Sequence, residues 1–283
     1  MTPVLDREEY IEQAYCFRVL RERVEERVAA QIILEQLPLE ILSTTRLPLA
    51  LEFVATDLKH TGLLSSGFTK MPHYFTPFQA FVLTNTESDR SRFSIEIGLL
   101  ILEREAQYRA GNPTPAGLFV FQFEALSRNR LGYDEGLLRM KEDAFFDDTW
   151  RQFFDVTRRQ LGVVDFGDLF YVRSEMYVRA QRRETPTYAP SVPPLFGEKE
   201  GKIARASRGR DPLYLFAALQ RQLGYPEVPR ARLKDDPGSQ LSQLKVKVHH
   251  LEQRLKLLES EARGQLDLSE FMAKPDFPPD DPE

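Results

Sequence analysis

The residues best suited to chemistry form a basic segment in an otherwise acidic chain. Nine basic and four acidic residues lie between Gly197 and Lys234, a net charge of +5, although the 283-residue chain as a whole carries −5. Guanidinium and ammonium groups bind phosphate and carboxylate groups, often beside a helix N-terminus. We therefore predict an anion-binding site whose side chains are Lys199, Lys202, Arg205, Arg208 and Arg210.

Asp211 opposes this prediction. It lies directly before Pro212, so we expect it to cap the helix that begins there. A capping carboxylate occupies the free amides of the helix and repels an incoming anion. The alternative is a solvated segment whose charges pair with one another.

No enzyme motif in the sequence is complete. Gly62 and Gly67 have the spacing of a phosphate-binding loop, but the lysine and hydroxyl that should follow the second glycine are missing. Asp165, Phe166 and Gly167 spell the metal-binding tripeptide of protein kinases without that family's other motifs, and a helix cap explains Asp165 equally well. The sequence also lacks the Glu-x-x-His pairs of di-iron bundles. We expect no catalytic residue, no metal site and no cofactor.

One loop keeps an enzymatic alternative open. It carries Lys59, His60, Lys70 and His73, which are side chains that an active-site lid could use. The simpler interpretation is a polar connection between helices. If this loop met the basic segment in one pocket, the chain would be an enzyme or binding protein for a phosphorylated small molecule.

The elements that must position these residues are helices. In three places a capping side chain precedes proline at a first helical position, namely Thr76-Pro77, Thr114-Pro115 and Asp211-Pro212. Asp6 and Glu9 predict a capping box at the first helix. Two Leu-Pro-Leu triplets, at 37–39 and 47–49, are expected to separate one helix from the next, because the residue before a proline avoids the helical conformation.

Two helices of the body carry specific packing predictions. Phe119, Phe121 and Phe123 alternate as in a strand, but the Thr114-Pro115 start favours a helix. The last helix of the body is expected to bury Leu213 together with Phe216.

The sequence therefore predicts an all-α protein in four parts. A compact multi-helix body covers residues 1–225, and a proline-containing linker covers 226–239. A coiled-coil helix follows at 240–265, and a disordered, acidic, proline-rich tail ends the chain at 266–283.

The coiled-coil helix is predicted from apolar residues that alternate at steps of three and four, which is the heptad pattern of helices that associate. We expect dimerisation through the seam formed by Leu241, Leu244, Val248, Leu251, Leu255 and Leu258. Packing of this helix against its own body and pairing with a different protein are the alternatives.

The charges beside the seam favour a parallel homodimer. In a parallel pair Lys247 faces Glu252 of the second copy, and Arg254 faces Glu259. An antiparallel pair centred on Glu252 and Arg254 would place each of these two residues against its own copy. Exposed pairs contribute only about 0.2 to 1 kcal/mol each, so they select the orientation rather than hold the dimer together.

The tail offers a second contact with other molecules. Between Gly264 and Glu283 six acidic residues stand against one lysine, a net charge of −5 that equals the basic segment's charge with opposite sign. The tail could cover the basic segment, and Phe271 and Phe277 could anchor it on a partner protein. A solubilising tail is the alternative.

Composition limits the cellular setting. Cys16 is the only cysteine, so no disulfide framework can form within the chain, and a reducing compartment is expected. Charged residues throughout the first thirty positions exclude a secretory signal, and the longest apolar run, 97–102, is too short to span a bilayer. We expect a cytoplasmic protein without a membrane partner.

The sequence is compatible with three functions. The first is a non-enzymatic scaffold or regulatory protein that homodimerises through the coil. The second is an enzyme or binding protein for an anionic small molecule, which would use the basic segment 197–210. The third is a dimer that contacts the nucleic-acid backbone through the same segment.

Overall fold

The computed structural model describes residues 5–88 and 93–230, and both ranges are built from helices. The all-α fold class is confirmed there, with no β-strand in either range. The coiled-coil helix 240–265 and the tail 266–283 lie outside the described residues. The described helices are α1 (Arg7–Glu25), α2 (Ala30–Gln36), the 3-10 helix η1 (Leu37–Leu39), α3 (Leu47–Thr61), α4 (Leu64–Thr69), α5 (Pro77–Thr86), α6 (Ile95–Ala110), α7 (Pro115–Asn129), α8 (Tyr133–Lys141), α9 (Asp148–Gln160), α10 (Phe166–Val172), α11 (Glu175–Glu184), α12 (Glu198–Ala206) and α13 (Pro212–Leu223).

The three proline-marked helix starts are confirmed. Thr76 accepts a hydrogen bond from the amide of Gln79 at 3.2 Å, and the Gln79 side chain accepts one in return from the Thr76 amide, which completes a capping box. Thr114 caps α7 by accepting from the Gly117 amide at 3.1 Å. Asp211 caps α13 in the same way.

The capping box predicted at the first helix does not form. Asp6 is the N-cap residue of α1, but its side chain makes no capping hydrogen bond. Glu9 is buried and accepts hydrogen bonds from the Arg46 amide at 2.8 Å and from the Tyr74 hydroxyl at 2.6 Å. Tertiary contacts therefore hold the side chain that the local pattern assigns to the cap.

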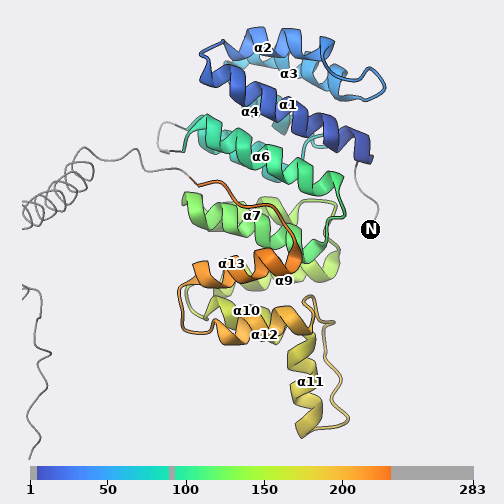
Figure 1. Ribbon diagram of the computed structural model, residues 1–283, viewed down its shortest axis with the longest axis vertical. Helices are drawn as coiled ribbons and strands as arrows, with labels where there is room; N and C mark the ends of the chain where they lie inside the picture. Colours follow the sequence, from blue (N-terminus) through green and yellow to red (C-terminus); the bar gives the residue numbers. More distant parts are fainter. Residues whose placement is uncertain (1–4, 89–92, 231–283) are drawn as a thin grey trace, which may run out of the picture. The chain divides into compact units, whose positions relative to one another are not determined.

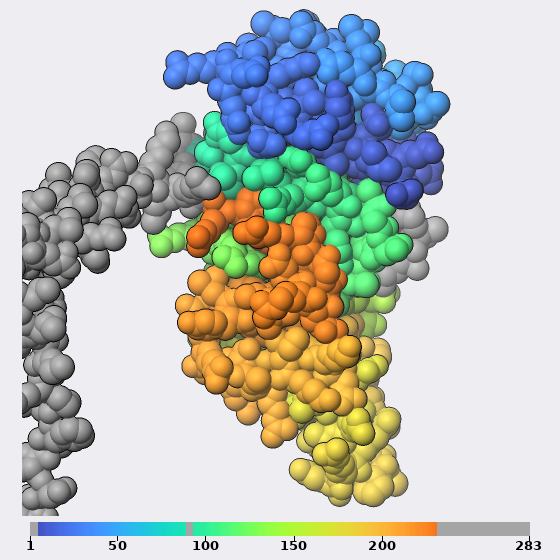
Figure 2. Space-filling model, viewed as in Figure 1, coloured from blue at the N-terminus to red at the C-terminus, as the bar shows by residue number. Residues whose placement is uncertain are grey.

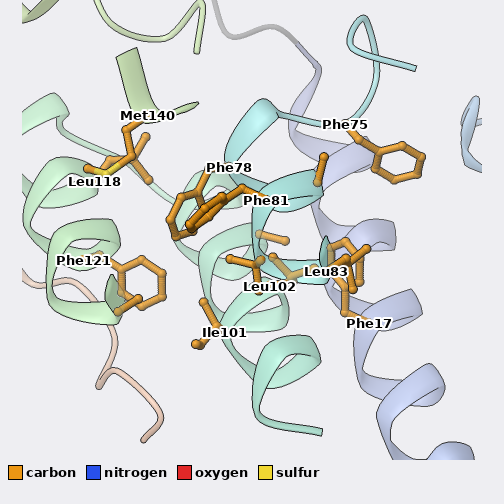
Figure 3. Packing of buried hydrophobic residues seen from close by; sticks show 14 of the residues in the cluster. Phe17, Phe75, Phe78, Phe81, Leu83, Ile101, Leu102, Leu118, Phe121 and Met140 are labelled. Carbon is orange, nitrogen blue, oxygen red and sulfur yellow. The ribbon is translucent and has the colours of Figure 1, made fainter. Parts of the chain in front are cut away.

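Successive helices pack on one another through the body (Figure 1). The α6 helix packs along α1 and also contacts α5 and α7, and α7 in turn contacts α8 and α13. Figure 3 shows part of the core, where buried side chains of α1, α5, α6, α7 and α8 pack together. Examples are Phe17, Phe78, Leu102 and Phe121, all of them almost fully buried.

The α7 helix has the longest buried run described in the body, ten consecutive residues from Gly117 to Leu126. The phenylalanine alternation is therefore helical, as predicted, and Phe121 and Phe123 lie on different sides of a helix that is covered all round. Phe119 lies at the centre of an aromatic cluster. Its ring centroid is between 5.3 and 6.4 Å from those of Phe123, Trp150, Phe153, Phe154, Phe170 and Phe196.

The body continues beyond Tyr225. The Tyr225 hydroxyl donates to the buried carboxylate of Glu124 at 2.7 Å. Arg104 then donates to the carbonyl of Glu227 at 2.7 Å, and Val228 is buried. The first residues of the predicted linker are therefore packed against α6 and α7.

One inward prediction in the last helix is wrong. Leu213 is exposed, whereas α13 buries Leu215, Phe216 and Leu219. A helix turns by about 100° per residue, so Leu213 lies beyond the edge of the face that these three residues define.

We expect Phe119→Ala to lower the free energy of unfolding by about 3 to 5 kcal/mol, because it leaves a cavity at the centre of the aromatic cluster. Urea denaturation of the full chain measures this loss. Phe53→Ala, at a side chain that is 43% exposed, is the control and should cost less than about 1 kcal/mol. Equal losses for the two variants would mean that the aromatic cluster is not the centre of the core.

Candidate interaction surfaces

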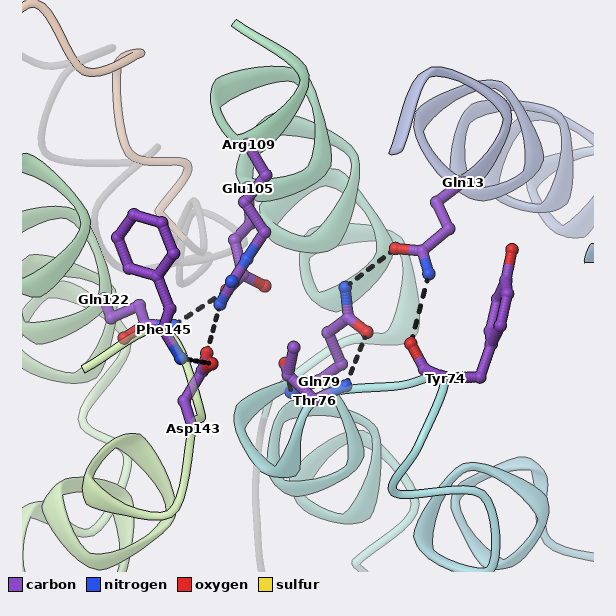
Figure 4. A network of polar contacts seen from close by, with 9 residues as sticks. All are labelled: Gln13, Tyr74, Thr76, Gln79, Glu105, Arg109, Gln122, Asp143 and Phe145. Carbon is purple, nitrogen blue, oxygen red and sulfur yellow. Dashed lines mark hydrogen bonds and ion pairs between the residues drawn. The ribbon is translucent and has the colours of Figure 1, made fainter. Parts of the chain in front are cut away.

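The most concentrated group of charges in the body is a buried network at α6 (Figure 4). The Arg109 guanidinium donates twice to Glu105, at 2.9 and 3.2 Å, and also pairs with Asp143. The Gln122 amide donates to the same Glu105 oxygen at 2.7 Å. Asp143 in turn accepts from the Phe145 amide at 2.9 Å.

Burial and charge act in opposite directions on this network. Burial raises the pKa of Glu105 above its usual range, although Arg109 partly opposes the shift. Burial also works against the charge of Arg109, but Asp143 and Glu105 keep its pKa above the usual arginine value. The guanidinium is therefore the fixed charge around which the other groups are arranged.

The network joins several elements of the body. The side chains of Glu105, Arg109 and Asp143 are each at most 1% exposed. They connect α6 to the loop that follows α8, and Gln122 adds α7 to the same group. The groups with raised pKa values in this network thus lie where α6, α7 and the loop after α8 meet.

The predicted anion-binding residues lie on α12 and in the turn that follows it, all of them exposed. Lys202 pairs with Glu198 at 2.8 Å, and Arg208 pairs with Asp168. Lys199, Arg205 and Arg210 have no carboxylate partner among the described residues. The segment is therefore partly neutralised by one ion pair within it and one with α10, and anion binding by it stays a prediction.

Two helix caps near these residues form as predicted. Asp211 accepts from the Leu213 amide at 2.9 Å, so the N-terminus of α13 is already capped, as expected. Asp165 caps α10 through the Gly167 amide at 2.8 Å and also accepts from the Gly209 amide at 2.9 Å. The kinase-like tripeptide is thus a helix start.

The histidine-bearing loop does not meet the basic segment. Lys59 and His60 lie at the end of α3, and Lys70 and His73 follow α4. These two helices pack with α1, α2 and α5, whereas α12 packs with α10, α11 and α13. Gly62 adopts a left-handed conformation (φ 73°) at the end of α3, and Gly67 lies against Val54, where a Cβ atom would be 3.1 Å away. These contacts explain the glycine spacing without a phosphate.

A cavity of about 600 Å³ lies between α5 and α8. Phe75 and Phe81 form part of its apolar wall. Its cationic side chain, Arg139, is already paired with Glu135 at 2.6 Å and with Glu142 at 3.1 Å. Because none of the predicted anion-binding residues lines it, the cavity does not supply the pocket that the enzymatic alternative needs.

An exposed apolar surface covers the N-terminal end of the body, where α2, η1 and α3 contact one another. In Figure 2 these N-terminal residues are coloured blue and lie at one end of the described body. Leu39 is 87% exposed and Leu49 70% exposed, although Leu37 and Leu47 in the same Leu-Pro-Leu triplets are fully buried. We define the N-terminal apolar surface as Ile32, Leu39, Leu42, Leu49 and Phe53.

Sequence reasoning missed this surface because it treated both triplets only as helix boundaries. Single exposed leucines are normal, but four large apolar side chains on three contacting elements, with Leu42 in the loop that follows η1, are typical of a surface that another molecule covers. Leu49 and Phe53 are four positions apart and share a face of α3, and this spacing is the signal that the sequence contained.

Metal and membrane sites are not supported within the described ranges. No group of three or more His, Cys, Asp or Glu side chains is placed there to hold a metal ion. Among the same residues, no helix has both the length and the apolar character needed to cross a bilayer. No protein-family model, curated protein or solved structure matches this chain.

We expect Arg109→Met to lower the free energy of unfolding by about 3 to 5 kcal/mol, because it leaves two buried carboxylates without their cation. Chemical denaturation near neutral pH measures the loss. Arg139→Met is a matched control, since Arg139 also pairs with a glutamate four positions earlier and with a second carboxylate, but at the surface. The control should cost no more than about 1 kcal/mol, and a similar loss in both variants would contradict the structural role of the buried network.

Proposed function

We propose that this chain is a cytoplasmic α-helical scaffold or regulatory protein that homodimerises through its C-terminal seam and presents the helical body to a partner. The observation that carries the interaction role is the N-terminal apolar surface. Removing apolar surface from water lowers the free energy by about 25 cal/mol per Å². In the isolated body Leu39 and Leu49 stay exposed, so this stabilisation is not obtained there.

The heptad seam supports the homodimer. Leucine recurs at every d position from Leu244 to Leu258, which is compatible with two-stranded pairing. The flanking charges favour the parallel orientation, in which both bodies leave the coil from the same end. A dimer of this kind would present two copies of each body surface to one partner, which raises the effective affinity without new contacts.

The chemistry of the body supports a non-enzymatic role. Burial raises the pKa values of Tyr74 and Tyr225, and each hydroxyl donates to a buried carboxylate rather than facing an accessible cleft. Burial likewise raises the pKa of Cys16, so this thiol is not a ready nucleophile. A reducing, cytoplasmic setting suits a chain with one buried cysteine.

The seam can be tested in the full chain. We expect Leu251→Glu with Leu255→Glu to convert a dimer into a monomer, because both substitutions place charges at the helix interface. His250→Glu with Gln253→Glu adds the same number of carboxylates on the outer face of the predicted helix and should leave the dimer intact. Sedimentation velocity distinguishes the two results.

A second pair of substitutions checks which surface holds the copies together. Leu39→Asp with Leu49→Asp alters the N-terminal apolar surface, and this variant should remain dimeric. If it became monomeric while the seam variant stayed dimeric, the body rather than the coil would join the copies, and the proposed role of the seam would be wrong.

The orientation has its own test. Lys247→Glu with Arg254→Glu should weaken a parallel dimer by about tenfold or more, because four attractive pairs become repulsive. Adding Glu252→Lys and Glu259→Lys should restore the affinity, since the pairs re-form with opposite signs. Dissociation constants from sedimentation equilibrium measure both steps, and failure of the second pair to restore affinity would contradict the parallel arrangement.

A further inference from the structure

Exposed basic side chains are found on α11, on α12 and in the turn that follows α12. Glu198, at the start of α12, pairs with Arg179 from α11 at 2.9 Å and with Lys202 from its own helix at 2.8 Å. This shared carboxylate links a cation of α11 to the first turn of α12. Arg182 and Arg183 follow Arg179 along α11, and Lys199, Arg205 and Arg210 lie along α12 and the turn after it.

Two of the four acidic side chains on α11 and α12 are already occupied by internal contacts. The hydrogen bond from Lys202, together with the charge of Arg179, lowers the pKa of Glu198. Glu200 is buried and accepts from Gln222 at 3.0 Å. Glu175 and Glu184 stand at the two ends of α11. In the described part of the chain, Arg182, Arg183, Lys199, Arg205 and Arg210 have no carboxylate partner, and we call these five residues the basic surface.

Tyr171 positions part of this charge. The guanidinium carbons of Arg205 and Arg208 each lie 5.8 Å from the centroid of its ring, and the Tyr177 ring packs edge-on against it at 5.5 Å. Stacking on an aromatic ring limits the freedom of a guanidinium before any ligand binds. Arg208 is neutralised by Asp168, which leaves Arg205 oriented and available.

The shape of this region favours an extended ligand. A small phosphorylated molecule needs a concave site, but four cavities of the body, including the 600 Å³ cavity, are lined by residues outside the basic surface. The α11 helix stands apart from the neighbouring layers and packs chiefly against α10 and α12 (Figure 1). An exposed row of cations on such an element suits a ligand with regularly spaced negative charges.

We propose that the basic surface binds the phosphodiester backbone of nucleic acid without reading its sequence. Contacts from lysine and arginine to phosphates supply affinity and register but no base specificity. Because the chain as a whole carries −5, this binding must come from a local surface and must fall steeply as salt displaces the protein.

The test uses the full chain and a fluorescently labelled DNA duplex of about 20 base pairs, followed by anisotropy between about 50 and 200 mM salt. Lys199→Gln with Arg205→Gln and Arg210→Gln should weaken binding by at least about tenfold at the lowest salt. The slope of log K against log salt should also become shallower by about 2 to 3, since about one counterion is released for each phosphate contact.

The matched control removes the same charge elsewhere. Arg18→Gln with Lys59→Gln and Arg159→Gln changes three exposed cations on α1, α3 and α9 and should leave both affinity and slope nearly unchanged. Equal weakening in both triple variants, or no binding by the unmodified chain at the lowest salt, would overturn the proposal. Neither triple variant touches the seam, so the result is independent of dimerisation.

Discussion

A helix that is buried on every side must satisfy its polar side chains inside the protein, and α7 places this requirement on the body. Ten consecutive residues of α7 are buried, and Gln122 and Glu124 are among them. Gln122 donates to Glu105, whose charge is compatible with burial because Arg109 pairs with it. Glu124 accepts from Tyr225, which fixes the end of the described chain against the body. These two hydrogen bonds join α7 to α6 and to the end of the described chain, while Phe119 of the same helix packs in the aromatic cluster.

This arrangement decides where function can reside. Glu105 and Arg109, whose pKa values are both raised, are buried and connect helices inside the body. What the body offers to other molecules lies on its outside: an apolar surface over α2, η1 and α3, and a basic surface over α11 and α12. The two surfaces differ in chemistry and belong to different groups of packed helices.

Local signals in the sequence predicted helix starts well and long-range partners poorly. Thr76, Thr114 and Asp211 cap their helices as expected, because a cap depends on residues only two or three positions away. The buried network could not be foreseen, since Arg109 and Asp143 are 34 positions apart and nothing local indicates that they meet. Glu9 does not form the predicted capping box for the same reason, since its hydrogen-bond partners are distant in the sequence. The exposure of Leu39 and Leu49 was not predicted, because the neighbouring prolines were interpreted only as helix boundaries.

The central claim is that two copies of this chain act together. Light scattering on the full chain, eluted from a size-exclusion column over a range of loading concentrations, tests that claim most directly. A dimer held by the seam has a mass of twice 32.8 kDa that falls toward the single-chain value only on strong dilution. A mass of 32.8 kDa at every concentration would contradict it.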